Sequence, residues 1–459
     1  MIKFRLNYRL LENFSWPLLG SMLLLCFCGL INLYSVSAST DFGGDCSWFT
    51  RQSLFLGLSL VGLGLSLFLD YQYLKKIIWP IYGLSIFSLV AVLVIGIKIN
   101  GATRWLDVGF FRFQPSEFVK VVVVVALAAW FAKCDLSAGL GLTDLFIPGL
   151  IILTPFILIY KQPDLGTAIH LFALSLPIFL AFRFRFHLLL VLILTLVLAV
   201  GFAVFLQVTD SWQFLQENGL IKKHQLQRVE AYLYPERDPS GNSWQMVQSE
   251  NAIGGGQIRG RGFMTGPQHK NGFLPEAETD FAFAALSEEW GFVGAILVLV
   301  LFAFLLISAL AVARRSQDRF GSLITLGLTS FLFWQVVINV GMVTGLLPVV
   351  GIPLPFISYG GTSLMVTVAS VGLILNIGMR RYLFQDNPVQ ENPFIWRQEL
   401  EFTIETSLVT IPIRRLAIDT PFNPEVHPQY RLPHRRPWAK YLRKSKYHNL
   451  NQWRLDKSL

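Results

Sequence analysis

Charged residues are scarce in this chain of 459 residues: Asp, Glu, Lys and Arg make up 15% of it, whereas 53% of the residues are hydrophobic. An average soluble domain has about 25% charged residues, so this composition excludes a soluble protein. The sequence also contains no HExxH, CxxC or Walker motif. It therefore lacks the usual patterns of a zinc peptidase, a thiol oxidoreductase and a P-loop nucleotide-binding protein.

Ten apolar stretches are the main feature of the sequence, and each is long enough to cross roughly 30 Å of hydrocarbon as a helix. They cover residues 16–38, 53–70, 77–97, 117–132, 144–160, 166–182, 187–208, 281–312, 320–346 and 359–379. The fold class predicted is an all-α polytopic membrane protein with about ten transmembrane helices. The first stretch follows a basic N-terminus, as a signal peptide would, but its length and the stretches behind it favour a retained signal-anchor.

Lysine and arginine follow the alternation expected of a membrane protein with a cytoplasmic N-terminus. The inner connections and the start of the tail hold Lys75, Lys76, Lys133, Arg183, Arg185, Arg314, Arg315, Arg319, Arg380 and Arg381. Both termini are therefore expected inside. Of the four cysteines only Cys46 falls outside, so no disulfide is possible within the outer face.

Three parts are predicted on this basis: a cytoplasmic N-terminus at 1–15, a membrane domain at 16–382, and a basic cytoplasmic tail at 383–459. The tail is expected to be a disordered or partly ordered arm near anionic lipid. The net charge of +9 lies mostly in the inner connections and the end of the tail, so it requires no nucleic-acid partner. Within the membrane domain, 209–280 is a long outer loop.

The long outer loop carries the most unusual sequence. Its middle, HQLQRVEAYLYPERDP, contains Arg228 and fits a short amphipathic helix on the membrane surface. Its end, 254–280, is rich in glycine and holds Arg259, Arg261, Gln268 and Lys270. Glycine lets backbone N–H groups approach an anion, so this stretch is expected to bind a phosphate-bearing ligand.

Three acids, Glu276, Glu278 and Asp280, stand where this loop meets an apolar stretch. A carboxylate at such a boundary meets a low dielectric that tunes its pKa, which indicates chemistry as well as binding. The last outer connection, 345–361, is apolar but too rich in glycine and proline for a helix. It is predicted to be a re-entrant loop against the site, because non-helical backbone at membrane depth must be buried in protein or line a cavity.

Other outer connections add polar side chains with two readings each. Arg51 is either a snorkelling interfacial cation or part of a site. Arg104 precedes Glu117 and Lys120, whose i, i+3 spacing predicts an ion pair, although a lysine one turn inside a span also favours a lined cavity. Asp164 is either a helix N-cap or a third set of site charges.

All these polar groups fall on the predicted outer face. They comprise Arg51, Arg104, Gln114, Glu117, Lys120, Gln162, Asp164, Arg228, the glycine and cation stretch, Glu276 and Asp280. Several cations with several carboxylates match a ligand that is lipid-borne, anionic and sugar-like. The sequence identifies no cofactor with certainty, and a divalent cation, Mg²⁺ or Mn²⁺, held by carboxylate and diphosphate oxygens is compatible with this set, with no histidine or cysteine ligands required.

Four strings resemble the SEDS family (shape, elongation, division and sporulation): GATRWLDVG…QPSEFVK, KQPDLGTA, GGGQIRGRGF…GPQHKNGFLPEAETDFAFAALSEEWGFVG, and GLLPVVGIPLPFISYGGTSL. The resemblance covers about 15–382, and QPDLGTA and PVVGIPLP are more similar to the rod-shape branch than to the division branch. It implies a peptidoglycan glycosyltransferase that polymerises lipid II, the undecaprenyl diphosphate-linked disaccharide peptide, at the outer face of the bacterial inner membrane with a class B penicillin-binding protein. The family's essential aspartate in LPExxTDF corresponds to Asp280, whereas Glu278 stands where several members have histidine.

Three hypotheses follow for the function. The first is a polymerase for cell elongation and shape in which Asp280 is the catalytic base, with a division-specific polymerase as its variant. The second is a lipid II flippase, and the third is a non-catalytic scaffold that recruits cell-wall enzymes. A flippase needs charged groups along a path through the bilayer. This chain concentrates them at one surface, which favours the enzyme.

Overall fold

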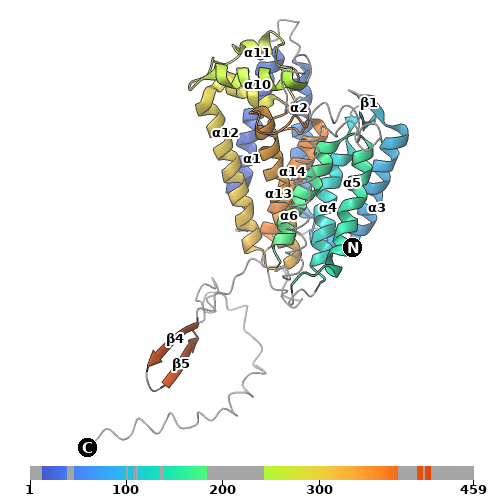
Figure 1. Ribbon diagram of the computed structural model, residues 1–459, viewed down its shortest axis with the longest axis vertical. Coiled ribbons are helices and arrows are strands. Elements are labelled where there is room, and N and C mark those ends of the chain that lie inside the picture. Colours follow the sequence, from blue (N-terminus) through green and yellow to red (C-terminus); the bar gives the residue numbers. More distant parts are fainter. Residues whose placement is uncertain are drawn as a thin grey trace, which may run out of the picture. The chain divides into compact units, whose positions relative to one another are not determined.

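A computed structural model describes residues 13–38, 46–99, 102–107, 109, 112–134, 139–182 and 242–380, and the backbone of 401–406 and 409–414. The chain divides into two compact units, 1–395 and 396–459. In the first unit, nine helices among the described residues match nine predicted stretches (Figure 1). They are α1 (Trp16–Ala38), α2 (Ser47–Phe68), α3 (Gln72–Ile95), α4 (Pro115–Phe131), α5 (Phe146–Lys161), α6 (Leu165–Leu180), α12 (Ala282–Arg315), α13 (Arg319–Val343) and α14 (Gly361–Met379).

The all-α membrane class is confirmed. Seven segments in the described part of the chain are long and apolar enough to cross a membrane, and α6 is a shorter apolar helix. The predicted stretch 187–208 lies outside the described residues, so the number ten stays a prediction. Several helices begin earlier than their apolar stretches, because hydropathy marks the hydrocarbon-spanning part and not the polar turn before it. In α4, for example, Pro115 occupies the first helical turn, where its missing N–H costs nothing.

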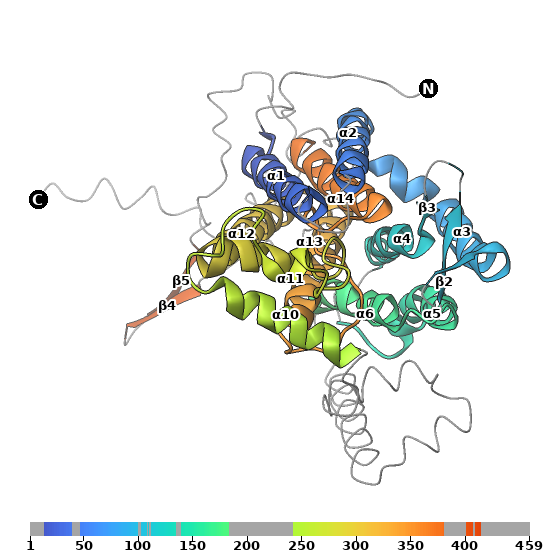
Figure 2. The same ribbon diagram turned by 90° about the horizontal axis from the view of Figure 1, so that it is seen from above.

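Helix α13 is the centre of the bundle. It packs against α4, α6, α12 and α14, and the view from above shows these helices around it (Figure 2). In its most apolar stretch of 18 residues, 72% of the residues are buried, compared with 17% in α2 and 22% in α3. Helix α2 packs against α14, and α3 packs against α4 and α5. The exposed leucines and valines of α2 and α3 therefore form surface suited to lipid.

A small antiparallel sheet joins α3 to α4, where only an irregular loop was expected. Its strands are β1 (Ile97–Ile99), β2 (Ala102–Asp107) and β3 (Arg112–Phe113), in the order β1-β2-β3. The register pairs Lys98 with Thr103 and Asp107 with Arg112. The sequence ATRWLD has the branched and aromatic residues typical of strands, but its charges indicated a loop. The sheet fixes the backbone that carries Arg104.

Two further helices of the outer loop are described: α10 (Asn242–Gly256) and α11 (Pro267–Lys270). Both pack against α12, and both lie at its N-terminal end (Figure 1). The sequence NSWQMVQSENAIGGG was expected only to lead back toward the site, because its apolar residues are sparse and its end is glycine-rich. The predicted amphipathic segment around Arg228 lies outside the described residues.

The second unit contains a two-stranded antiparallel hairpin, β4 (Glu401–Thr406) and β5 (Val409–Arg414). Its register pairs Phe402 with Ile413 and Ile404 with Ile411. The tail was predicted to be disordered or partly ordered, and the hairpin is a regular element within it at 401–406 and 409–414. The short period-2 pattern FTIET…VTIPIR is the signal that the overall polarity of the tail concealed.

Candidate active site

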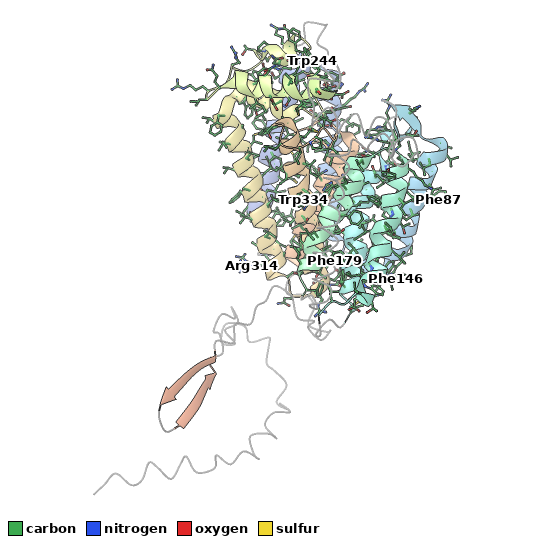
Figure 3. All side chains as sticks on the ribbon, in the orientation of Figure 1. Phe87, Phe146, Phe179, Trp244, Arg314 and Trp334 are labelled. Carbon is green, nitrogen blue, oxygen red and sulfur yellow. The ribbon has the colours of Figure 1, made fainter. Side chains whose placement is uncertain are left out.

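The segment that leads into Asp280 lies at the α10 end of the membrane unit. Figure 3 shows Trp244, on α10, at the opposite end of the molecule from Arg314, in the last turn of α12. Asp280 lies two residues before the first turn of α12, so it belongs to the Trp244 end. Arg314 is one of the inner cations of the sequence prediction. The separation of the two ends along α12 thus agrees with the predicted separation of the outer site from the inner cations.

Asp280 is held between α13 and the loop 345–360. Asn339 of α13 donates from Nδ2 to Asp280 O at 2.9 Å and to Ile352 O at 2.8 Å. Tyr359 N donates at 2.7 Å to the backbone oxygen of Glu278, which is two residues before Asp280. A Cβ at Gly351 would lie 3.1 Å from Asp280 Oδ2, so the loop backbone passes beside the carboxylate. The Asp280 side chain is half-buried.

The loop 345–360 is non-helical and buried in protein, as its apolar sequence predicts. Its buried residues are Val349, Ile352, Leu354, Pro355, Phe356, Ile357 and Ser358, whereas Leu346 at its start is exposed. The side-chain amide of Gln52 on α2 holds the C-terminal end of the loop through two hydrogen bonds. Its Nε2 donates to Ser358 O at 3.1 Å, and its Oε1 accepts from Gly360 N at 3.2 Å. Sequence reasoning missed the positioning roles of Gln52 and Asn339. A polar amide inside an apolar helix is the signal for both.

The other two acids of the segment differ in environment. Glu276 is exposed, and its Oε2 accepts from Thr279 Oγ1 at 3.0 Å. Burial raises the pKa of Glu278; a backbone hydrogen bond opposes that shift, and the neighbouring charge of Glu276 adds to it. The segment therefore combines an exposed carboxylate with a more buried one next to Asp280, as its place at the loop-to-helix boundary predicts.

Glu117 and Lys120 form a buried ion pair, as their spacing predicts. Lys120 Nζ lies 2.7 Å from Glu117 Oε1, and the two side chains are 1% and 3% exposed. The ammonium also lies 5.2 Å from the centroid of the Phe331 ring on α13. Glu117 Oε2 has no hydrogen-bond partner among the described residues. The pair is thus a buried contact within the first turns of α4.

Arg104 and Asp164 connect two of the predicted outer connections, and the predicted N-cap role of Asp164 is confirmed. Its Oδ1 caps α6 by accepting from Thr167 N at 3.2 Å, while its Oδ2 lies 3.7 Å from Arg104 Nη1. Arg104 Nη2 also donates to Pro163 O at 2.7 Å. The guanidinium is therefore oriented by the connection between α5 and α6.

The glycines before α11 have a packing role, which corrects the prediction of an N–H cradle for phosphate. Gly260 N donates to Gly256 O at 2.8 Å, and Gly262 N donates to Glu289 O at 3.0 Å, so these donors are occupied. A Cβ at Gly256 would collide with Ser287 O, and one at Gly260 would collide with Glu289 O. Glycine is required here because the loop lies directly on the backbone of α12.

The cations of this loop remain on its surface. Arg259 and Arg261 are exposed, and Arg261 Nε donates to Gly255 O at 2.8 Å. Lys270 is half-buried, and Arg51, near the start of α2, is exposed. Gln268 is placed through its backbone, since its N–H donates to Glu288 Oε1 at 3.0 Å. Arg228 lies outside the described residues, so the structure does not bring it to the site.

A buried cluster of His269, Glu288, Glu289 and Ser35 was also missed. The imidazole lies between the two carboxylates, and the Ser35 hydroxyl of α1 donates to Glu289. Two adjacent acids in an otherwise apolar stretch, LSEEWG, are the sequence signal, because such acids need partners. Among the described residues no group of three His, Cys, Asp or Glu side chains is arranged to hold a metal ion. The predicted divalent cation therefore gains no support from these residues.

Comparisons with known proteins cover most of the chain. A family model described as "Cell cycle protein", for FtsW, RodA and SpoVE, matches residues 16–383. The chain is 35% identical over 384 residues to the probable peptidoglycan glycosyltransferase FtsW of Trichlorobacter lovleyi, covering 81% of this chain and 95% of that protein. It is 40% identical over 301 residues to the peptidoglycan glycosyltransferase MrdB of Escherichia coli K12, covering 66% and 77%.

Two solved structures have the same fold. One belongs to a peptidoglycan synthase complex that coordinates polymerization and crosslinking; it has a TM-score of 0.66 and 31% identity and covers 80% of this chain and 98% of that one. The other is the rod shape determining protein RodA of Thermus thermophilus, with a TM-score of 0.58, 28% identity and the same coverage. The chain therefore belongs to the FtsW, RodA and SpoVE family of cell cycle proteins, the SEDS family that its motifs resemble.

Proposed function

We infer that this chain is a peptidoglycan glycosyltransferase of the bacterial inner membrane, the activity for which its relatives FtsW and MrdB are named. We propose that it polymerises lipid II at the outer membrane face, with both termini in the cytoplasm. The observation that carries the proposal is the placement of Asp280. Its half-buried carboxylate lies beside the backbone of loop 345–360, in the segment that joins the glycine- and cation-rich stretch to α12.

The proposed reaction joins two lipid-linked saccharides. The Asp280 carboxylate takes the proton from the acceptor 4-hydroxyl, whose oxygen attacks the anomeric carbon of the donor while the bond to the lipid diphosphate breaks. Cations that stabilise the leaving diphosphate come from the set Arg51, Arg104, Lys120, Arg228, Arg259, Arg261 and Lys270. Glu117, Asp164, Gln268 and Glu276 complete the proposed substrate-binding set. Fixed counter-charge favours the transition state because negative charge develops on the diphosphate.

A class B penicillin-binding protein is the proposed partner, since the similar solved structure belongs to a complex that couples polymerization to crosslinking. Relatives named for both branches match this chain. We propose the elongation role on the QPDLGTA and PVVGIPLP sequences, with division as the variant. Purification with each type of partner distinguishes the two roles, because only the physiological partner is expected to stimulate polymer formation.

The test of the enzyme uses purified full-length chain, its partner, lipid II and a gel that resolves glycan polymer. Asp280→Asn keeps the side-chain shape but removes the proton acceptor, so the rate is expected to fall by about 10²–10⁴-fold. Asp107→Asn is the matched control, since Asp107 is an exposed aspartate of β2 outside the proposed machinery. Near-normal polymer from Asp280→Asn would contradict the assignment of the base. If the wild-type protein forms no polymer but moves lipid II across the membrane of a vesicle, the result would instead favour a flippase.

A further inference from the structure

We propose that His269 is a positioning residue, which joins the two buried carboxylates of Glu288 and Glu289 and thereby fixes the loop that leads into Asp280. The inference rests on the proposed function, because it assigns a role in the same reaction. The four residues His269, Glu288, Glu289 and Ser35 are called the His269 cluster below. The His269 ring contacts the two carboxylates of α12, so we propose that it acts on the reaction through the loop.

The His269 cluster is buried and bonded on both sides of the ring. His269 Nδ1 lies 3.2 Å from Glu288 Oε2, and Nε2 lies 3.2 Å from Glu289 Oε1. The histidine side chain is 0% exposed and each carboxylate side chain is 1% exposed. Gly266 closes the cluster, because a Cβ there would lie 2.6 Å from Glu288 Oε2 and would collide with the imidazole.

With both carboxylates ionised, this geometry fits a doubly protonated ring. A neutral imidazole has one N–H and one acceptor nitrogen, so one of its nitrogens would face a carboxylate oxygen with no hydrogen between them. An imidazolium donates to both carboxylates. Burial by itself lowers the pKa of His269, but the hydrogen bonds and charges of Glu288 and Glu289 outweigh it and raise the pKa to about 9. The cation is therefore present at neutral pH.

The carboxylates of the cluster also bind the loop backbone. Glu289 Oε1 accepts from Met264 N at 3.0 Å, and Glu288 Oε1 accepts from Gln268 N at 3.0 Å. Met264 has a φ of 61°, a conformation that a non-glycine residue adopts at some cost. The bond from Glu289 helps to hold it there. Loss of the imidazolium would leave two adjacent buried carboxylates to repel each other, and these bonds would weaken.

A second hydrogen bond carries the constraint toward Asp280. Gln268 O accepts from Leu274 N at 2.9 Å, and Leu274 opens the segment LPEAETD that ends at Asp280. At its other end this segment is held by α13 and by loop 345–360, through Asp280 O and Glu278 O. The His269 cluster therefore supplies the N-terminal attachment of a segment whose C-terminal attachment is independent.

The elements packed around the ring are α12, α1 and α10, and the ring itself belongs to α11. Helix α12 contributes Glu288 and Glu289, which are the two charges that shift the His269 pKa. Helix α1 contributes the hydroxyl of Ser35, which also accepts from Met264 N at 3.2 Å. Helix α10 packs on α11, but the carboxylate of its Glu250 is directed at Gly345. Within α11 itself, Lys270 follows the histidine. We therefore expect a single protonation step in this cluster, on the His269 ring.

The test compares wild type with two variants of the full-length chain, assayed with partner and lipid II. His269→Ala removes the bridge between the carboxylates. The triple variant H269Q/E288Q/E289Q replaces the charged contacts with amides, which hydrogen-bond without a titrating group. Initial rates are measured from pH 7 to pH 10 over a range of lipid II concentrations. Trypsin cleavage in the exposed loop around Arg261 is followed at each pH as a structural readout.

Three results are expected. Wild-type kcat falls about tenfold as pH rises through about 9, while loop cleavage accelerates. His269→Ala shows that lower kcat already at pH 7. The triple variant, compared with wild type at each pH, lacks the fall. A fall in kcat larger than the change in KM separates positioning of Asp280 from loss of substrate binding.

Wild-type and His269→Ala rates that agree at every pH would overturn the proposal. A triple variant with the wild-type pH profile would overturn it too, because the titrating group would lie elsewhere. If the triple variant fails to reach the membrane, the wild-type titration decides alone: a constant kcat and constant cleavage between pH 8 and pH 10 refute the role. If the wild-type protein forms no polymer at any pH, the proposed function is refuted instead. Failure of the His269 role and failure of the proposed function are therefore distinguishable.

Discussion

Removal of one partner of the Glu117–Lys120 pair should destabilise the protein strongly. With 2.7 Å between Nζ and Oε1, Coulomb's law gives an attraction of about 6 kcal/mol at an effective dielectric constant of about 20. The desolvation of two nearly inaccessible side chains offsets most of that gain. A variant that keeps one charge keeps its desolvation cost and loses its partner. Glu117→Gln and Lys120→Met are therefore each expected to cost about 3–5 kcal/mol.

The double variant E117Q/K120M separates pairing from burial. It removes both charges, and the methionine occupies nearly the volume of the lysine stem against Phe331. We expect it to be more stable than either single variant, with a coupling energy of at least about 2 kcal/mol. The assay is unfolding by denaturant in mixed micelles. Lys133→Met, an exposed lysine just past the end of α4, is the control and should stay within about 0.5 kcal/mol of wild type.

Additive losses in the double variant would refute this reasoning, because they would show that the two side chains act independently. The same protein also tests the proposed site. If the double variant folds as expected but forms no polymer, the charge of Lys120 has two roles: it pairs with Glu117 and it also binds the substrate. If it folds and polymerises at the wild-type rate, the pair is purely structural and Lys120 leaves the proposed substrate-binding set.

Three further predictions concern the loop, its histidine and the orientation. Gly256→Ala should cost about 1–3 kcal/mol of unfolding free energy through its collision with Ser287 O, whereas Gly254→Ala, with open space around it, should not; equal losses would contradict the packing role. The folded-state pKa of His269 is raised from 6.5 to about 9, so its stabilisation of about 3 kcal/mol is complete below pH 6.5 and lost as pH rises through 9. A denaturant titration series that shows no such loss relative to His269→Ala would exclude this. In a cysteine-free background, cysteine at Ser240 should react with an impermeant reagent in outer-permeabilised cells, and one at Ser445 should not; the reverse result would invert the topology.

Apolar length predicts the membrane helices well because hydropathy is a local property. It does not find α10, since that helix owes its place to α12 and its own sequence has few apolar residues and three terminal glycines. The sheet that carries Arg104 was missed for the same reason. Its charges indicate a loop locally, and only pairing between β1, β2 and β3 makes the strands.

The site was partly predictable. Spacing on one helix was enough for Glu117 and Lys120, and the Asp164 cap follows from its place before α6. The prediction of a phosphate cradle failed because a glycine-rich composition indicates only that something lies close to the backbone. It does not say whether that is a ligand or another part of the protein. Here the approaching surface is the first part of α12, which is far away in the sequence from Gly256. The two carboxylates that contact the His269 ring belong to another element, so the residues around His269 in the sequence do not show them; the ring meets them only once the loop is folded onto Glu288 and Glu289.

Loop 345–360 also has a mechanical consequence. Its backbone is bonded to α2 through Gln52, lies against Gly29 of α1 at Phe356, and touches the first turn of α6 at Val350. It reaches the Asp280 segment within one residue of the Gln52 contact, through Tyr359 N and Glu278 O. A displacement of α2 is therefore expected to move the end of loop 345–360 and, with it, the backbone of the segment that leads into Asp280.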